Sequence, residues 1–192
     1  TSSAQGQLLR REAPDGNATV QAATAVLNEL AAIPLSGIPQ SLLARAEGVV
    51  ICPNVIKAGF VLGGRFGHGV LLVKTADGGW SNPVFLRLTG GSIGWQAGVS
   101  STDVVLVLAT RKGVDGVLQG QRFTLGADAS IAAGPVGRTA AAGTDATLQS
   151  EIFSYSRSRG LFAGVSLDGS ALTVDPAANG AYYGRAGITP GE

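Results

Sequence analysis

The sequence predicts an α+β fold in which glycine-rich antiparallel strands form a strongly coiled or barrel-like sheet, with N-terminal and peripheral helices against it. Three observations carry this prediction. Helical periodicity comes first along the chain, a long middle region consists of Val, Ile, Leu and Phe runs separated by glycines, and 29 of the 192 residues are glycine. Helices followed by many strands favour α+β over an alternating βαβ order. Glycine inside strands is typical of bulges and sharp coiling, which is why we expect a coiled sheet.

Two helices are expected before the strands. From Asn17 to Ile33 apolar residues recur at three- and four-residue spacing, which is typical of an amphipathic helix, and Glu29 is the only charge in this stretch. Because a membrane-surface helix usually carries Lys or Arg on its polar face, this stripe favours packing against the core. Pro39 and Gly48 frame a shorter predicted helix from Gln40 to Glu47.

Strands are expected from Gly48 to about Ala133. Residues 67–75 and 80–89 flank Ala76-Asp77-Gly78-Gly79, whose glycines supply the positive φ angles of a hairpin turn. The unbroken apolar run over 104–110 predicts a central strand that is buried on both faces.

The C-terminal half is predicted to be mixed. A short helix is expected over 112–120, and 134–143 is expected to be an Ala/Gly-rich loop or a poorly patterned segment. Residues 144–156 could form a helix or a strand, because both periods fit parts of this stretch. A second hairpin is predicted from 161–167 and 171–174, which flank Asp168-Gly169-Ser170.

The composition is that of a folded domain without the charge of a nucleic-acid-binding protein. Hydrophobic residues make up 45% of the chain and charged residues 14%, which is enough apolar material for a core. The 14 Lys and Arg are balanced by 13 Asp and Glu, so nucleic acid is not an expected partner. No uncharged apolar run reaches the roughly 18 residues that span a bilayer, and any membrane contact should be peripheral.

One domain is expected from the length, since domains usually have about 50–250 residues. Residues 1–16 are predicted to be a flexible N-terminal segment, 17–187 a single domain and 188–192 a C-terminal tail. The chain contains no Met and begins at Thr1, which favours the removal of an upstream segment. A cleaved export signal and a trimmed boundary both fit this observation.

The reactive side chains argue against catalysis and against a metal. His68 is the only histidine and Cys52 the only cysteine, so no His/Cys metal cluster can form. No Gly-x-Ser-x-Gly elbow occurs. We therefore expect no enzyme, no metal and no cofactor. Trp80 and Trp95 are predicted to line the core or a groove rather than to anchor the protein in a membrane.

Two places combine basic side chains with glycines and are candidates for a lipid-binding site. In the first, Arg65 and His68 stand among the glycines of Gly64–Gly69. This segment is either a backbone nest that receives a lipid phosphate or a bulged strand with Arg65 in solvent.

The second place is the pair Arg157 and Arg159. They lead directly to Leu161 and Phe162, an apolar pair that could meet acyl chains beside the charges. The alternative is that these arginines are solvated or paired with carboxylates such as Glu151.

Several segments, read in order, resemble the SYLF domain family. They are 63–71, 80–83, 90–98, 102–103, 125–130, 133–138 and 155–169, and the resemblance covers about 38–184. It implies a non-enzymatic phospholipid-binding domain, peripheral to a membrane, whose partner is an anionic phospholipid or membrane surface. The likeness to stand-alone bacterial members implies an exported, periplasmic or envelope-associated, lipoprotein-like protein. The alternative function is a structural or protein-interaction domain of the cell envelope.

Overall fold

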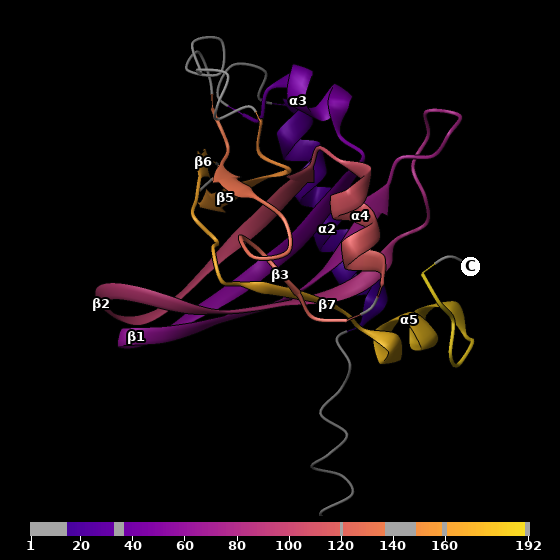
Figure 1. The fold of residues 1–192 in the computed structure, drawn as a ribbon. Coiled ribbons are helices and arrows are strands. Elements are labelled where there is room, and N and C mark those ends of the chain that lie inside the picture. The colour runs from indigo at the N-terminus through magenta and orange to yellow at the C-terminus, as the bar shows by residue number, and fades with distance from the viewer. Residues whose placement is uncertain (1–14, 33–36, 120, 137–148, 159–160, 191–192) are drawn as a thin grey trace, which may run out of the picture.

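The computed structural model describes residues 15–32, 37–119, 121–136, 149–158 and 161–190. Its centre is a seven-stranded sheet that curls strongly, with helices packed around it (Figure 1). This arrangement confirms the predicted α+β class with a coiled, mostly antiparallel sheet. The helices are α2 (Gly16–Ala32), α3 (Gln40–Arg45), α4 (Arg111–Leu118) and α5 (Pro176–Tyr183).

The sheet is organised by two long strands, β1 (Gly48–Val73) and β2 (Val84–Leu108). They pair antiparallel over their length and form a two-stranded ribbon, closed by a turn in which the Thr75 N–H donates to the Gly79 carbonyl. The predicted turn is thus confirmed. The two strands run through the glycines of this region without ending.

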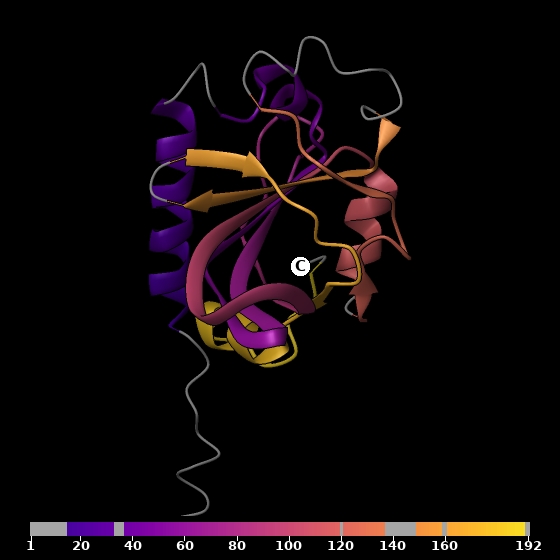
Figure 2. The same cartoon turned by 90° about the vertical axis from the view of Figure 1, so that its left-hand side faces the viewer.

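The ribbon bends near its middle and projects there beyond the rest of the sheet (Figures 1 and 2). We call this part the ribbon tip; it comprises 56–66 of β1 and 89–101 of β2. A register shift between Gly59 and Val61 lies within it, and a second one lies between Cys52 and Val55. Such irregularities increase the local twist of an antiparallel pair.

The remaining strands attach to the other edge of β2. Their bounds are β3 (Phe123–Thr124), β4 (Ile131–Ala133), β5 (Ile152–Ser158), β6 (Leu161–Gly164) and β7 (Ala171–Val174). β5 pairs with 103–108 of β2 and β7 with 86–89. The end of β2 therefore lies between β1 and β5, and Val104 to Leu108 are buried, which confirms the predicted central strand.

The predicted second hairpin is wrong in its pairing. The chain does turn at Asp168 and Gly169, where Gly169 has a φ of 77°. However, β6 pairs with β5, whereas β7 pairs with β2 and β3. The turn carries the chain along one edge of β2, from the side of β5 at the end of β2 to the start of β2, instead of closing a hairpin. Of the ambiguous stretch 144–156, residues 152–156 form strand, and 144–148 lie outside the described residues, as does most of the predicted loop over 134–143.

Two hydrophobic cores occupy the two faces of the sheet. One includes Leu86, Leu88 and Leu106 and is covered by Val114 and Val117 of α4. The other contains apolar residues of the sheet packed against α2 and α5, and its members from α2 are Ala23, Val26 and Leu30. The predicted core packing of the N-terminal helix is therefore confirmed.

Glycines in β1 let the two halves of this strand approach each other. A Cβ added at Gly69 would collide with the Ile51 carbonyl and with Cys52, and one at Gly67 would press on Val55. These positions have ordinary extended φ angles, so close approach rather than backbone conformation requires glycine here.

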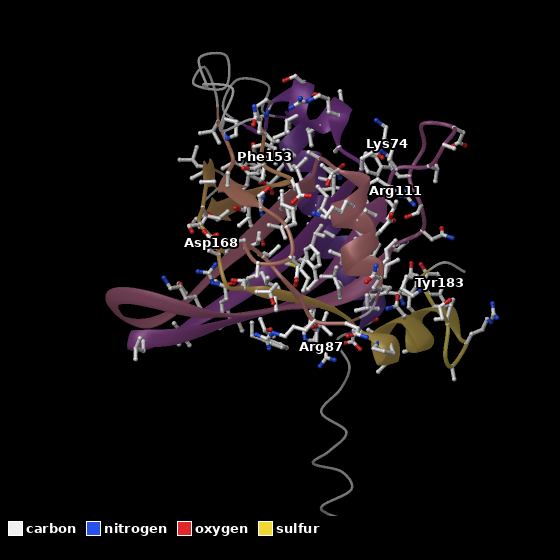
Figure 3. The ribbon with its side chains drawn as sticks, viewed as in Figure 1. Lys74, Arg87, Arg111, Phe153, Asp168 and Tyr183 are labelled. Carbon is white, nitrogen blue, oxygen red and sulfur yellow. The ribbon has the colours of Figure 1, made fainter. Side chains whose placement is uncertain are left out.

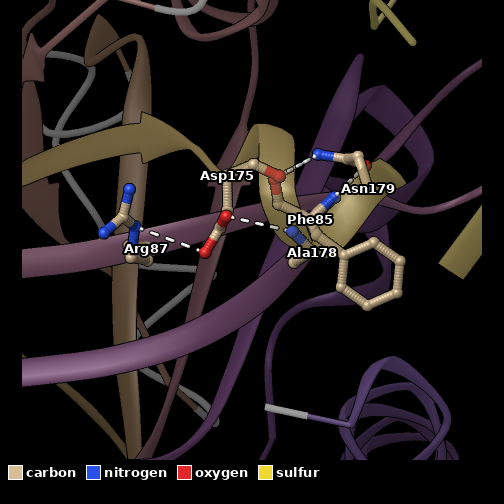
Figure 4. Close-up of polar contacts among 5 residues, drawn as sticks. All are labelled: Phe85, Arg87, Asp175, Ala178 and Asn179. Carbon is tan, nitrogen blue, oxygen red and sulfur yellow. Dashed lines mark hydrogen bonds and ion pairs between the residues drawn. The ribbon is translucent and has the colours of Figure 1, made fainter. Parts of the chain in front are cut away.

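Helix α5 was not predicted, although the sequence carries its signals. Asp175 is its N-cap and accepts from the Ala178 N–H at 3.1 Å, Pro176 opens it, and Gly184 ends it with a φ of 67°. Asn179 ties the helix to β2, because its side chain accepts from the Phe85 N–H and donates to the Phe85 carbonyl, both at 2.9 Å (Figure 4). The start of β2 is thereby fixed against the C-terminal helix.

Candidate functional site

The ribbon tip exposes large apolar side chains. Ile56 is 48% exposed, Leu62 74%, Phe66 44% and Val99 76%. The register pairs Ala58 with Val99, Leu62 with Ile93 and Phe66 with Thr89. Since alternate residues of a strand share a face, the four exposed side chains lie on the face of the ribbon that α2 covers nearer its ends.

The ribbon tip also lacks acidic residues. Between Glu47, which precedes β1, and Asp103, near the end of β2, Asp77 in the turn is the only carboxylate. Lys57 and Arg65 belong to the tip and share the face opposite the exposed apolar residues, since they pair with Ser100 and Gly90. The tip therefore combines an apolar face with positive charge that no acidic residue of the tip offsets.

Arg65 is half-buried, and none of the described carboxylates forms an ion pair with it. Burial lowers the pKa of its guanidinium from the ordinary value. A desolvated cation without a counterion is favourably placed to gain an anion. Its predicted role in lipid binding stays a prediction.

His68 follows Phe66 by two residues in β1 and therefore lies on the same face as the exposed apolar residues. Its ring contacts Phe66 edge-on, with centroids 4.8 Å apart. Burial lowers the pKa of His68, the charge of Asp175 raises it and that of Arg87 lowers it. Together with the start of α2, Phe66 and His68 line a groove of about 270 Å³.

Arg87 is the cross-strand neighbour of His68 and lies beside the N-cap of α5. Its Nε is 3.4 Å from Oδ2 of Asp175, whose side chain is buried (Figure 4). This is an ion pair without a well-aligned hydrogen bond, because the Arg87 Nε has no hydrogen-bond partner among the described atoms.

No backbone nest forms over Gly64–Gly69. These residues stay in regular antiparallel register with β2, and none of them has a positive φ. A nest needs consecutive N–H groups that turn to one side, whereas the N–H groups of a strand alternate. The bulges lie elsewhere in β1, so neither of the two sequence interpretations describes the backbone of this segment.

Arg157 is held by two carboxylates. Its Nη2 and Nε lie 2.6 Å and 2.7 Å from Oδ2 of Asp103 on β2, and its Nη1 contacts Glu29 of α2. Burial alone would lower the pKa of Arg157, but the hydrogen bonds and charges of Glu29 and Asp103 raise it overall. Asp103 also accepts from the N–H of Asn54, a residue with a φ of 53°, at 2.9 Å.

In this arrangement Arg157 has a structural role, because it links β5 to β2 and α2. The predicted alternative of a carboxylate partner describes its geometry, but the partners are Asp103 and Glu29. Glu151 instead contacts Lys112 and Ser130. Because the cluster holds two negative charges and one positive charge, Arg157 is poorly placed to attract a phosphate.

The other residues of the second candidate site diverge. Leu161 is 67% exposed on β6, whereas Phe162 is buried in the core under α2. Arg159 lies outside the described residues. The structure therefore does not gather this set into one surface.

Three further features of the described residues bear on function. Trp80 is half-exposed at the turn between β1 and β2, so of its two predicted places, core or groove, the core is wrong; the Trp95 side chain lies outside the described part. None of the described helices is long and apolar enough to cross a bilayer. Within the same residues, no group of three His, Cys, Asp or Glu side chains converges on one point.

The fold and its surface define a class of protein: an α+β domain built on a coiled ribbon whose tip is apolar and basic. Comparison with known proteins gives the family. The family described as "Las17-binding protein actin regulator" (Ysc84) matches residues 89–192, just over half of the chain. The chain belongs to this family, whose domain is the SYLF domain.

Relatives from fungi and mammals support the assignment. The LAS seventeen-binding protein 3 of Saccharomyces cerevisiae is 40% identical over 149 residues, which are 77% of this chain and 32% of that protein. An SH3 domain-containing protein of Schizosaccharomyces pombe is 44% identical over 154 residues, 79% of this chain and 35% of that protein. The human SH3 domain-containing YSC84-like protein 1 is 36% identical over 146 residues, 76% of this chain and 42% of that protein. The chain thus spans well under half of the length of these relatives.

Sequence reasoning missed the apolar residues of the ribbon tip and Lys57. A usable signal was present, because the stretch from Gly48 to Thr102 contains a single acidic residue. Neither a motif search nor the overall charge of +1 shows such a local imbalance.

Proposed function

We propose that this domain binds anionic phospholipid membranes without catalysing a reaction, and that the ribbon tip is the contact surface. The observation that carries the proposal is the combination of exposed Leu62 and Val99 with Lys57 and Arg65 on a projecting ribbon tip that contains no acidic residue. Apolar side chains gain free energy on leaving water, and each cation near an anionic surface contributes about 1 kcal/mol.

The two faces of the tip act together in this proposal. The apolar face enters the boundary between head groups and acyl chains. Lys57 and Arg65 lie on the other face of the same two-stranded layer, within the Debye length of about 10 Å, and therefore feel the negative surface potential. Such binding weakens with salt but does not vanish, because the apolar contribution is insensitive to screening.

Vesicle co-sedimentation tests the proposal. The parent protein should bind vesicles that contain phosphatidylglycerol more tightly than neutral phosphatidylcholine vesicles. Leu62→Ser with Val99→Ser should weaken binding at all salt concentrations by about tenfold or more, if each side chain contributes about 1 kcal/mol at the interface. Lys57→Gln with Arg65→Gln should weaken it mainly at low salt.

Matched controls separate the surfaces. Arg122→Gln removes an exposed cation near α4 and should leave vesicle binding unchanged. Arg157→Ala tests the second predicted site, where we expect lower stability rather than a direct loss of lipid contact. Equal affinity of the parent and both ribbon double variants would remove the ribbon tip from consideration.

A protein partner is the second candidate function. It is favoured by the names of the relatives, which are described as binding Las17 and regulating actin. An exposed apolar surface also suits a protein interface. Vesicle binding that is absent in the parent, together with specific capture of a Las17-type protein that the ribbon variants lose, would favour this function over the first.

The proposal has two further parts, which are the lack of enzymatic activity and the location of the protein in the cell. The description of the family as binding proteins supports a non-enzymatic role. Hydrolysis of a generic ester by the purified domain, abolished by His68→Ala, would contradict it. Association with the bacterial cell envelope stays a prediction that fractionation of the source cells tests.

A further inference from the structure

A groove at the other end of the molecule is not explained by membrane binding through the ribbon tip. It has a volume of about 580 Å³ and lies where the end of β1 and the start of β2 meet α4, α5 and the segment after α5. Figure 3 shows Arg111 and Tyr183, which line it, on the side away from the bent end of the ribbon. This volume is within the usual range of small-molecule sites, about 300–1,000 Å³.

The lining of the groove has an apolar part contributed by the core. Val73 and Val84 belong to the buried cluster between the sheet and α4, and Leu118 packs against that cluster. Tyr183 closes one side, because its hydroxyl donates to the Pro83 carbonyl at 2.6 Å and holds the ring in place. A hydrocarbon chain can therefore lie on side chains that are already fixed.

The charge of the lining is positive. Arg111 from α4 and Arg185 from the segment after α5 are both part of it, and none of the described residues that line the groove is a carboxylate. Arg111 pairs through Nε with Oδ1 of Asp115 at 3.1 Å, but both side chains are more than half exposed. An exposed i,i+4 pair is weak, and the guanidinium keeps further N–H donors for an anion.

We propose that this groove binds a single-chain amphipathic anion, with its head group on Arg111 and its hydrocarbon chain over Val73, Val84 and Leu118. Carboxylate and phosphate monoester heads share the required chemistry, namely negative charge and several acceptor oxygens. The site is independent of the ribbon tip and of the proposed membrane contact.

Isothermal titration with defined probes tests the proposal in the full chain. Decanoate, below its micelle concentration, should bind saturably with one site. Hexanoate should bind more weakly, by up to about fourfold for each methylene removed. Decanol should bind more weakly than decanoate, and inorganic phosphate alone should not saturate the site. Decyl phosphate distinguishes the two head groups, and tighter binding than decanoate would assign the phosphate monoester.

Two variants on α4 give a matched comparison. Arg111→Gln should weaken decanoate binding by about tenfold or more, since a hydrogen bond to a charged group is lost. Lys112→Gln removes the neighbouring cation, which is 76% exposed and pairs with Glu151, and should leave binding within about twofold. Circular dichroism of both variants checks that each remains folded.

Nuclear magnetic resonance locates the probe. Decanoate should shift the methyl signals of Val84 and Leu118 and leave those of Leu62 unchanged. Shifts confined to the ribbon tip, equal binding of decanol and decanoate, or undiminished binding by Arg111→Gln would each overturn the proposal. None of these outcomes depends on whether the ribbon tip binds vesicles.

Discussion

Replacing Asp103 should be among the most damaging single changes outside the apolar cores. Asp103 is 9% exposed and accepts from Arg157 Nη2 at 2.6 Å, from Arg157 Nε at 2.7 Å and from the Asn54 N–H at 2.9 Å. Breaking a buried ion pair by removing one partner costs about 3–5 kcal/mol. Arg157 keeps some solvent contact and its second partner, Glu29, so we expect Asp103→Ala to cost about 3 kcal/mol, at the lower end of that range.

Two further variants separate the contributions of the Asp103 charge and of Glu29 to the free energy of unfolding. Asp103→Asn keeps an acceptor for the Asn54 N–H but loses the charge, and should cost about 1–2 kcal/mol. Glu29→Gln removes the partner that is 48% exposed, and should cost less than about 1 kcal/mol. The expected order of stability is therefore parent, Glu29→Gln, Asp103→Asn and Asp103→Ala.

Urea denaturation followed by circular dichroism measures these differences. With a slope of about 2 kcal/mol/M, a loss of 3 kcal/mol moves the midpoint by about 1.5 M. The slope itself should stay constant, because the compactness of the native state is not altered. An effect of Glu29→Gln as large as that of Asp103→Ala, or a loss below about 0.5 kcal/mol for Asp103→Ala, would refute the reasoning.

Three other predictions concern the ribbon and its anchors. Gly69→Ala should destabilise by about 1–3 kcal/mol in thermal unfolding, because the new Cβ meets the Ile51 backbone, whereas Gly64→Ala, with space around it, should be close to neutral. His68 has a lowered pKa in the folded state, so its contribution to stability is present above about pH 6.5 and is lost as the pH falls through the pKa of the folded state. The difference in unfolding free energy between the parent and His68→Gln should therefore decrease as the pH falls below about 6.5. A difference that does not change with pH in this range would contradict the prediction. Asn179→Ala should cost about 2–3 kcal/mol because it leaves the buried Phe85 N–H without its acceptor, while the exposed Asn82→Ala should stay within about 0.5 kcal/mol.

Local signals predicted the elements whose geometry is decided locally. The three- and four-residue spacing after Asn17 and the limits set by Pro39 gave α2 and α3 almost at their observed bounds. The turn after Thr75 followed from its glycines. Helix α5 was missed even though Asp175, Pro176 and Gly184 are ordinary start and stop signals.

The failures concern partners that are distant in sequence. Gly169 indicates a reversal of the chain, but whether the next strand joins β6 or β2 depends on which edge is free in three dimensions. The exposure of Trp80 is also decided by its position in three dimensions, because its residue type predicts burial but it lies at an outer turn. The carboxylate partners of Arg157 come from α2 and β2, and no local pattern links these segments.

The ribbon tip shows how one sequence property serves both the fold and the proposed function. An exposed strand edge with apolar side chains tends to pair with other chains, and proteins limit this tendency by charge, bends or irregular register. Residues 90–102 of β2 contain no charge and no proline, so the bend and the register shift beside Gly59 must supply the protection, together with Lys57 and Arg65 on β1. The same bend carries Leu62 and Val99 away from the body of the protein, where a membrane can cover them. A variant that straightens the ribbon should therefore lose solubility as well as the proposed membrane contact, whereas Leu62→Ser with Val99→Ser should lose the contact and gain solubility.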